Sequence, residues 1–385
     1  MTTFFNSFAA ASGDATTVGP PASMSVPAPP AASWSPPTTR TESLTMSGFI
    51  ENPAIGSGGA LQAVTFFVAN NLTPVTGHLL VHDDSYQWTG RMALSGGGWD
   101  VELDTRRERE QLRDWLKTSG GYTITHVGRL RRSDGGAFTA AQAIDGLNLL
   151  QTVLSFAAGR QVACLLPVGY DSHGAAVWSD WRMRLLDPWT GAQHVADLHY
   201  PSHWHELFAR FGAIWDDKFR SEEVLYRSFR LYLDASYGST LQLAVSTAQA
   251  GLELLAYTHL VEDHQMLSKT AYDKLDAHER LSDYLTQHLI DDSVPSTQAP
   301  ALAAAAARVS AATAPQLVVK MRNGVIHPSR TKPKFSPDEW LEARQLSLRY
   351  LLLGILAYAA YQGTYRDPLE PNKWAGTVAK VPWNP

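Results

Sequence analysis

Three side chains near the C-terminal end of the chain combine the properties that cleavage of a phosphodiester bond requires. Arg322, Asn323 and His327 stand in the segment RNGVIH. The guanidinium group of an arginine presents a rigid set of donors that matches two phosphate oxygens, and it stays charged near neutral pH. Histidine gains and loses a proton readily in that range, so His327 can serve as a general acid or base. On a helix, Asn323 shares a face with His327, where its amide can orient the imidazole or contact the phosphate.

RNA supplies its own nucleophile, the 2′-hydroxyl group, so its cleavage needs proton transfer and charge stabilisation but no metal ion or cofactor. Arg322 and His327 together supply both functions. One histidine cannot conveniently deprotonate the 2′-hydroxyl and protonate the leaving 5′-oxygen at once, and no second histidine lies near the motif in the sequence. A symmetric dimer would bring two copies of the motif together, so we expect a homodimer or a higher homo-oligomer.

The segment around the motif is basic, although the whole chain carries a formal net charge of -5. Residues 293–337 include no Asp or Glu, whereas residues 217–292 are rich in both. A charge run is usually only a solvated surface, but here it surrounds the motif, and a phosphate backbone would bind on the basic side. The cations that we expect to contact RNA are Lys320, Arg330, Lys332 and Lys334.

Glu253 stands among apolar residues in the segment LELL of an expected helix. An unpaired carboxylate in such surroundings would be costly. Two interpretations stay open: Glu253 pairs with Arg322 or another cation and supports the site, or it lies on the polar face of its helix.

Residues 46–200 have a mixed pattern that predicts an α+β region. Segments such as WDVEL (99–103) and YTIT (122–125) alternate with the period of a half-buried strand, and residues 161–186 predict a hairpin with its turn at 171–174. Helices are expected over 105–117 and 139–158. The tryptophans of this region can build a stacking surface for sugars or bases, but core packing explains most of them more simply. They are Trp88, Trp99, Trp115, Trp178, Trp181 and Trp189.

After Ser202, an expected N-cap, helical periodicity continues almost to the C-terminus. We expect a connecting helix over 201–217 and, over 218–366, an all-α up-and-down bundle whose first helix opens at Ser221. Further helices are expected at about 268–289, 301–325 and 336–362. One helix carries a seam of apolar residues at steps of four and three, namely Leu241, Val245, Ala248, Leu252 and Leu255. Pro328 disfavours helical geometry at His327, which places that ring at an exposed helix end.

The two ends of the chain predict less regular structure. Residues 1–45 are dominated by Pro, Ala, Ser and Thr and predict a flexible tail without a secretion signal. Residues 367–385, with Trp374 and Trp383, predict a packed but irregular arm. The apolar run LLLGILAYAAY (351–361) is shorter than the roughly 20 residues that span a bilayer, so it predicts a buried helix and no membrane association. The single Cys164 excludes a disulfide framework, which suits a cytoplasmic protein.

His203 and His205, ahead of Asp216 and Asp217, are of types that bind metals. Histidines two residues apart on a helix point in different directions, however, so we expect a surface or interface role and no metal site.

The motif of Arg322, Asn323 and His327, in a basic segment at a helix end of an all-α region, resembles that of the HEPN superfamily of ribonucleases. Its nuclease members carry Arg, a polar residue and, a few residues later, His. The likeness extends over about 218–366, where LELL (252–255) looks like the helix that faces the motif and 336–362 looks like the helix after it. It implies a dimeric helical bundle and an endonuclease that leaves a cyclic phosphate end.

The layout of a β-containing region followed by such a bundle is similar to that of ApeA-like anti-phage defence proteins. It implies a toxin or abortive-infection effector that its N-terminal region controls, with a phage-derived trigger or a regulatory protein as a partner. Two alternatives stay open. The bundle is a catalytically silent HEPN-like scaffold that binds RNA or protein, or the Trp-rich region is a ligand-binding module that the bundle dimerises.

Overall fold

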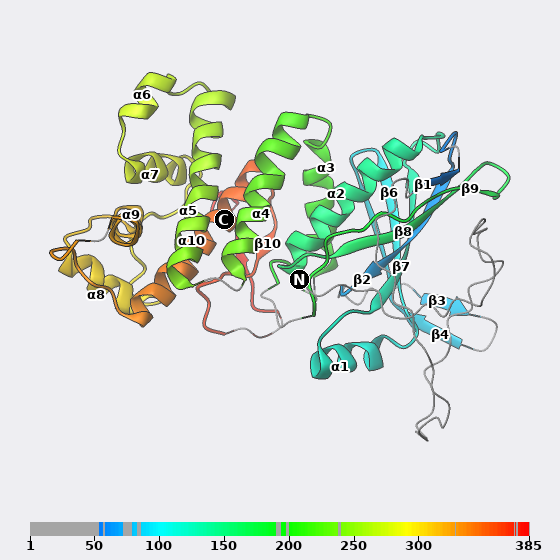
Figure 1. The fold of residues 1–385 in the computed structure, drawn as a ribbon, viewed down its shortest axis with the longest axis horizontal. Coiled ribbons are helices and arrows are strands. Elements are labelled where there is room, and N and C mark those ends of the chain that lie inside the picture. Colours follow the sequence, from blue (N-terminus) through cyan, green and yellow to red (C-terminus); the bar gives the residue numbers. More distant parts are fainter. Residues whose placement is uncertain are drawn as a thin grey trace, which may run out of the picture. The chain divides into compact units, whose positions relative to one another are not determined.

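The computed structural model describes a sheet followed by helices (Figure 1). The described residues are 54–56, 58–71, 79–82, 86–189, 194–197, 200–237, 240–327, 329–372, 374 and 376–384. Residues 53–385 form one compact unit. The expected α+β region followed by a mostly helical region is therefore confirmed, while the expected tail at 1–45 lies outside the described residues.

The sheet has seven antiparallel strands in the order β1-β9-β8-β2-β7-β6-β5. They are β1 (Ala54–Gly56), β2 (Ala63–Ala69), β5 (Arg91–Gly96), β6 (Trp99–Thr105), β7 (Ile124–Arg132), β8 (Ala163–Tyr170) and β9 (Ala176–Asp180). A separate hairpin pairs β3 (Leu79–His82) with β4 (Tyr86–Thr89). The expected hairpin of 161–186 is confirmed as β8 and β9, and Asp171 fixes its turn by accepting the N–H groups of His173 and Ala175 at 2.9 Å.

Alternation along the strands gives the sheet one buried face and one open face. In β6, Trp99, Val101 and Leu103 are buried, whereas the intervening acidic residues are half-buried. Helices α2 (Ala140–Ala158) and α3 (Pro201–Ala213) cover the buried face (Figure 1). The helix expected over 105–117 is α1 (Arg109–Ser119), which starts later because β6 continues to Thr105.

Helix α2 has the boundaries that its sequence predicts. Thr139 and Gln142 form a capping box at its start, and Gly159 ends it in the left-handed conformation with a φ of 65°. Leu147, Leu150 and most of the second half of the helix are buried, because the helix is enclosed by the sheet and by other helices.

The helical region contains more breaks than the sequence pattern predicts. Its elements are a π-helix η1 (Phe219–Tyr226), α4 (Arg227–Ser236), α5 (Leu241–Tyr257), a π-helix η2 (Thr258–Asp263), α6 (Lys269–Lys274), α7 (Ala277–Gln287), α8 (Pro300–Arg308), α9 (Ala314–Ile326) and α10 (Pro337–Tyr358). The helix expected over 268–289 is divided because Asp276 forms a capping box with Glu279. The helix expected over 301–325 is divided where Thr313 caps α9 just before Pro315.

The N-cap expected at Ser202 and the helix start expected at Ser221 were both wrong. Helix α3 starts at Pro201, ahead of Ser202, because proline suits the first helical position. Ser221 is fully buried inside η1, and the carboxylate of Asp217 accepts the N–H of Arg220 at 3.1 Å. The apolar seam of α5 is confirmed, since Val245, Ala248, Leu252 and Leu255 are at most 4 % exposed.

An aromatic cluster joins the sheet region to the bundle. The ring of Phe156 in α2 lies 5.5 Å from that of Phe211 in α3, 6.2 Å from that of Phe229 and 5.9 Å from that of Tyr232, both in α4. All these residues are at most 2 % exposed. The two regions of this unit therefore share one hydrophobic core.

The C-terminal segment is more regular than expected. Strand β10 (Thr364–Tyr365) pairs with β11 (Ala379–Lys380), and Trp383 packs on the core and donates a hydrogen bond to the carbonyl of Tyr361 at 2.7 Å. Trp374, in contrast, is 77 % exposed. Residues 351–356 of α10 are buried, as predicted. No helix in the described part of the chain has both the length and the apolar character needed to span a bilayer.

Glycines allow α3 to lie directly on the turn between β5 and β6. A Cβ atom at Gly212 would stand 2.5 Å from the backbone nitrogen of Gly97. We predict that Gly212→Ala lowers the free energy of unfolding by about 1 to 3 kcal/mol, because backbone atoms cannot yield as a flexible side chain does.

The matched control is Gly324→Ala in α9, where a Cβ atom would meet nothing within 4 Å. This variant should stay within about 1 kcal/mol of the wild type. Urea denaturation monitored by tryptophan fluorescence measures both changes, and equal stability of the two variants would contradict the close contact.

Candidate functional site

Helix α9 carries the motif and holds its first part against the bundle. The hydroxyl of Thr313 accepts the N–H of Gln316 at 3.3 Å, which caps the helix. Leu317 and Met321 are fully buried, and the helix packs on α5 and α7. This packing leaves Arg322 and Asn323 half-buried on the last turns.

The structure places Arg322 and Asn323 in contact and His327 at the helix end. Nη1 of Arg322 donates to Oδ1 of Asn323 at 3.4 Å. His327 is exposed and follows the last helical residue, and its N–H donates to the carbonyl of Asn323 at 3.1 Å. The expected helix end is confirmed. Within the described residues, no hydrogen bond joins the His327 ring to Arg322 or Asn323.

Two of the four lysines and arginines expected to contact RNA are bound to helix ends. Nζ of Lys332 donates to the carbonyls of Asn323 at 3.0 Å and His327 at 2.6 Å. Nζ of Lys320 donates to the carbonyls of Val309 at 3.0 Å and Ser310 at 3.2 Å, just after α8. These carbonyls form the negative ends of α9 and α8, which cations stabilise. Both lysines therefore have a structural role.

The remaining two expected contacts, Arg330 and Lys334, are exposed. Their side chains make no ion pair with any described carboxylate. They are the cations of this group that are available to a phosphate backbone.

Part of the positive charge of the segment is balanced from outside it. The guanidinium of Arg308 donates to both carboxylate oxygens of Glu339, at 2.8 and 3.1 Å. These bonds hold the pKa of Glu339 below its usual range. Glu339 also caps α10 together with Ser336. The acid-free segment ends at residue 337 in the sequence, but in the folded chain a carboxylate from beyond that residue neutralises one of its cations.

Glu253 is half-buried and has a partner on its own helix. Its Oε1 accepts a hydrogen bond from Nε2 of Gln249, one turn earlier, at 2.8 Å. The described ion pairs include none between Glu253 and Arg322. The carboxylate is thus stabilised within α5.

Apolar side chains stand beside the motif on the surface. Val325 is 46 % exposed and Ile326 is 45 % exposed, immediately before His327. Gly324 faces open space. Adjacent exposed apolar residues at a candidate site are typical of a contact surface.

His203 contacts the C-terminal strand pair. It is buried, its ring stacks on that of Tyr200 at 4.9 Å, and its Nε2 shares a hydrogen bond with Oγ1 of Thr364. Among the described residues, no group of three His, Cys, Asp or Glu side chains is arranged to hold a metal ion.

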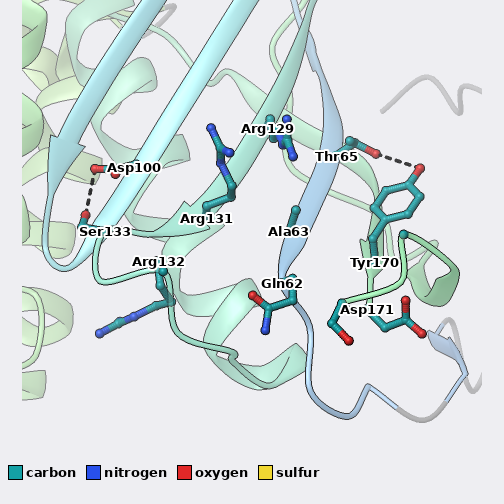
Figure 2. A pocket seen from close by; sticks show the side chains of 13 residues that line it. Gln62, Ala63, Thr65, Asp100, Arg129, Arg131, Arg132, Ser133, Tyr170 and Asp171 are labelled. Atoms are coloured by element: carbon teal, nitrogen blue, oxygen red, sulfur yellow. Dashed lines mark hydrogen bonds between the residues drawn. The ribbon is translucent and has the colours of Figure 1, made fainter.

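A second candidate site lies on the open face of the sheet, where sequence reasoning considered only tryptophans (Figure 2). Trp99, Trp178 and Trp189 are at most 9 % exposed, so core packing is confirmed for them, while Trp115 and Trp181 are exposed and the side chain of Trp88 lies outside the described residues. The open face instead carries arginines. The sequence pattern that could have indicated these arginines is the alternation of ITHVGRLRR (124–132), which places Arg129 and Arg131 on one face of β7.

These features define a chain with an antiparallel sheet and a helical bundle on one shared core, with a candidate site on each. Family models match the same two regions: YopA central domain over residues 56–192 and YopA C-terminal domain over residues 218–380. The chain is also similar to the SPbeta prophage-derived uncharacterized protein YopA of Bacillus subtilis (strain 168). The two are 28 % identical over 341 residues, which cover 88 % of this chain and 76 % of the relative. No solved structure matches.

The lysine contacts allow a structural role to be separated from a nucleic-acid-binding role. We predict that Lys332→Met lowers the free energy of unfolding by about 1 kcal/mol, because the end of α9 loses its cation. Lys334→Met should leave stability unchanged, because this side chain is exposed. Thermal denaturation of both variants measures the difference, and equal melting temperatures would contradict the capping role of Lys332.

Proposed function

We propose that the chain is a metal-independent endoribonuclease of the HEPN type that acts as a homodimer. The observation that carries the proposal is the arrangement at the end of α9. There Arg322 and Asn323 are hydrogen-bonded to each other, and the exposed His327 is the first residue after the helix. The available cations Arg330 and Lys334 lie in the segment that continues from it. Arg322 and Asn323 are half-buried and hydrogen-bonded to each other, which favours a preorganised anion site.

The chemistry uses the two histidines of the dimer. One His327 removes the proton from the 2′-hydroxyl, whose oxygen attacks the phosphorus atom. The His327 of the second copy gives a proton to the leaving 5′-oxygen, so the dimer as a whole takes up one proton and releases one. Arg322 stabilises the charge that develops on the phosphate oxygens, and Asn323 orients its guanidinium. The products carry a 2′,3′-cyclic phosphate and a 5′-hydroxyl.

The exposed apolar residues beside the motif support the dimer. Burying Val325 and Ile326 against a second copy would remove apolar surface from water and would place two His327 rings near one symmetry axis. A contact at this position explains how one histidine per chain can serve both steps.

We further propose that cleavage makes the protein a toxin or anti-phage effector in the cytoplasm, controlled by the sheet region. The related Bacillus subtilis protein is described as prophage-derived, which supports a role in phage biology. In this proposal a phage-derived molecule or a regulatory protein acts as the trigger.

A second candidate function is a catalytically silent scaffold that binds RNA or protein through the same segment. It is favoured by the structural roles of Lys320 and Lys332, which leave fewer cations for substrate. RNA that is bound but never cut would distinguish it.

We predict that His327→Ala reduces RNA cleavage at least about a hundredfold, because it removes the acid and the base. Melting temperature should not change, since the side chain is exposed. The assay measures 2′,3′-cyclic phosphate ends in cellular RNA during phage infection and in purified reactions that contain EDTA.

The matched control is His173→Ala, an exposed histidine in the β8–β9 turn, which should cleave like the wild type. Equal RNA profiles for the wild type and His327→Ala during infection and in the purified reactions would refute the nuclease, and RNA binding without cleavage by either protein would favour the scaffold.

We also predict that Ile326→Asp converts the dimer to a monomer and abolishes cleavage, because a charge would be buried in the contact. Met183→Asp, at a residue that is 86 % exposed in the sheet region, is the control and should remain dimeric. Sedimentation equilibrium gives the mass of each protein. A fully active monomer would rule out the two-copy site.

A further inference from the structure

The open face of the sheet carries a concave cleft of about 920 Å³ (Figure 2). Strands β2 and β7 form its floor, the segment after β7 forms one wall, and the β8–β9 turn forms the other. This volume is in the range of pockets that hold small molecules. Most of its lining residues carry polar side chains, with Arg129 and Arg131 near its centre and Tyr170 at its side.

The acidic residues of the cleft are already engaged. Oδ1 of Asp100 accepts the hydroxyls of Ser95 at 2.7 Å and Ser133 at 2.8 Å. Asp171 accepts two N–H groups of its own turn. These carboxylates therefore have partners without any ligand.

Among the described residues that line the cleft, Arg129 is the arginine without an ion pair. Glu102 lies directly opposite Arg129 in the register of β6 and β7, yet its carboxylate pairs with Arg131 at 3.5 Å. Arg132 points away, with its guanidinium 4.9 Å from the centre of the Trp99 ring (Figure 2). Arg129 is exposed and has no carboxylate within ion-pair distance among the described residues.

The groups around Arg129 are suited to an anion with several acceptor oxygens. Thr65 is its cross-strand neighbour, and the hydroxyl of Thr65 donates to that of Tyr170 at 3.4 Å, which leaves the Tyr170 proton for a ligand. Gln62 adds an amide. The Arg131–Glu102 pair is exposed and therefore weak, so Arg131 can also turn to an anion. Guanidinium and hydroxyl donors of this kind match a phosphate group.

The same face continues into an apolar surface. Phe67 is 36 % exposed and its cross-strand neighbour Val127 is 44 % exposed. Both lie two residues along their strands from the Thr65–Arg129 pair. A flat ring attached to a phosphate can rest on such a surface.

We propose that this cleft binds a nucleoside phosphate, with the phosphate on Arg129 and Arg131 and the base toward Phe67 and Val127. The phosphate belongs either to a free nucleotide or to the 5′ end of an RNA strand. The site stands independently of the nuclease, because it shares no residue with the motif on α9.

Isothermal titration calorimetry on the full chain tests the site. The protein carries His327→Ala, so that RNA probes stay intact if the bundle cleaves RNA. The probes are the four ribonucleoside 5′-monophosphates, the matching nucleosides, and a short oligoribonucleotide with and without a 5′-phosphate. We expect the phosphorylated probes to bind and the nucleosides to bind at least about tenfold more weakly.

Arg129→Gln should weaken phosphate binding about tenfold. Arg129→Lys should bind phosphate with intermediate affinity, because lysine restores the positive charge but not the paired N–H donors of the guanidinium group. Arg113→Gln, at an exposed arginine of α1, is the matched control and should bind like the parent protein.

Tighter binding of the phosphorylated oligoribonucleotide than of the monophosphates assigns the ligand to an RNA end, and the reverse assigns it to a free nucleotide. Monophosphates that bind no better than nucleosides, or unaltered binding by a folded Arg129→Gln protein, would overturn the site. Because binding is measured directly, this result does not depend on whether the bundle cleaves RNA.

Discussion

The rest of the structure depends on the close packing of α3 on the sheet and on α2, which contacts the bundle. Gly212 brings the backbone of α3 onto that of Gly97 at the β5–β6 turn, and Phe211 places its ring beside Phe156 of α2. Any larger residue at position 212 would separate the helix from the turn and would displace Phe211 from Phe156, the residue of α2 that contacts α4. Interiors packed at crystal density transmit such displacements, so the sheet and the bundle are mechanically linked. This link gives a physical route by which ligand binding in one region can affect the other.

The basic segment illustrates how charge serves stability and function in the same stretch of chain. Lys320 and Lys332 bind the carbonyl ends of α8 and α9, and Arg308 pairs with Glu339. Without these cations, the negative end of α9 would lie uncompensated beside the motif and would repel a phosphate. The capping lysines are thus compatible with anion binding even though they are not free to contact RNA. Arg322 itself is half-buried and donates a hydrogen bond to Oδ1 of Asn323.

The sheet uses its two faces differently. One face is enclosed by α2 and α3, and its strands supply Phe66, Val101 and Leu130 to the core. The other face pairs charges across strands, as in Arg91 with Asp104 at 2.7 Å. Within the part of the chain that the structure describes, this pairing leaves Arg129 without a carboxylate partner. A mismatch of this kind costs little at an exposed position, and it leaves a directed donor where a ligand can bind. The two candidate sites therefore lie on different scaffolds within one compact unit.

The sequence by itself determined the local features of this protein. Alternation predicted β6, the start of β7 and the β8–β9 hairpin, and Thr139 and Ser336 marked two helix starts correctly. Pro328 placed His327 at a helix end. These features depend on residues a few positions apart, whose preferences act within one turn or one strand. Only the tertiary structure decided that Lys332 caps α9, that Glu253 bonds to Gln249 and that Arg131, rather than Arg129, pairs with Glu102. In each case the side chain could reach several partners, and the packing of segments that are distant in the sequence determines which partner lies close enough to bond.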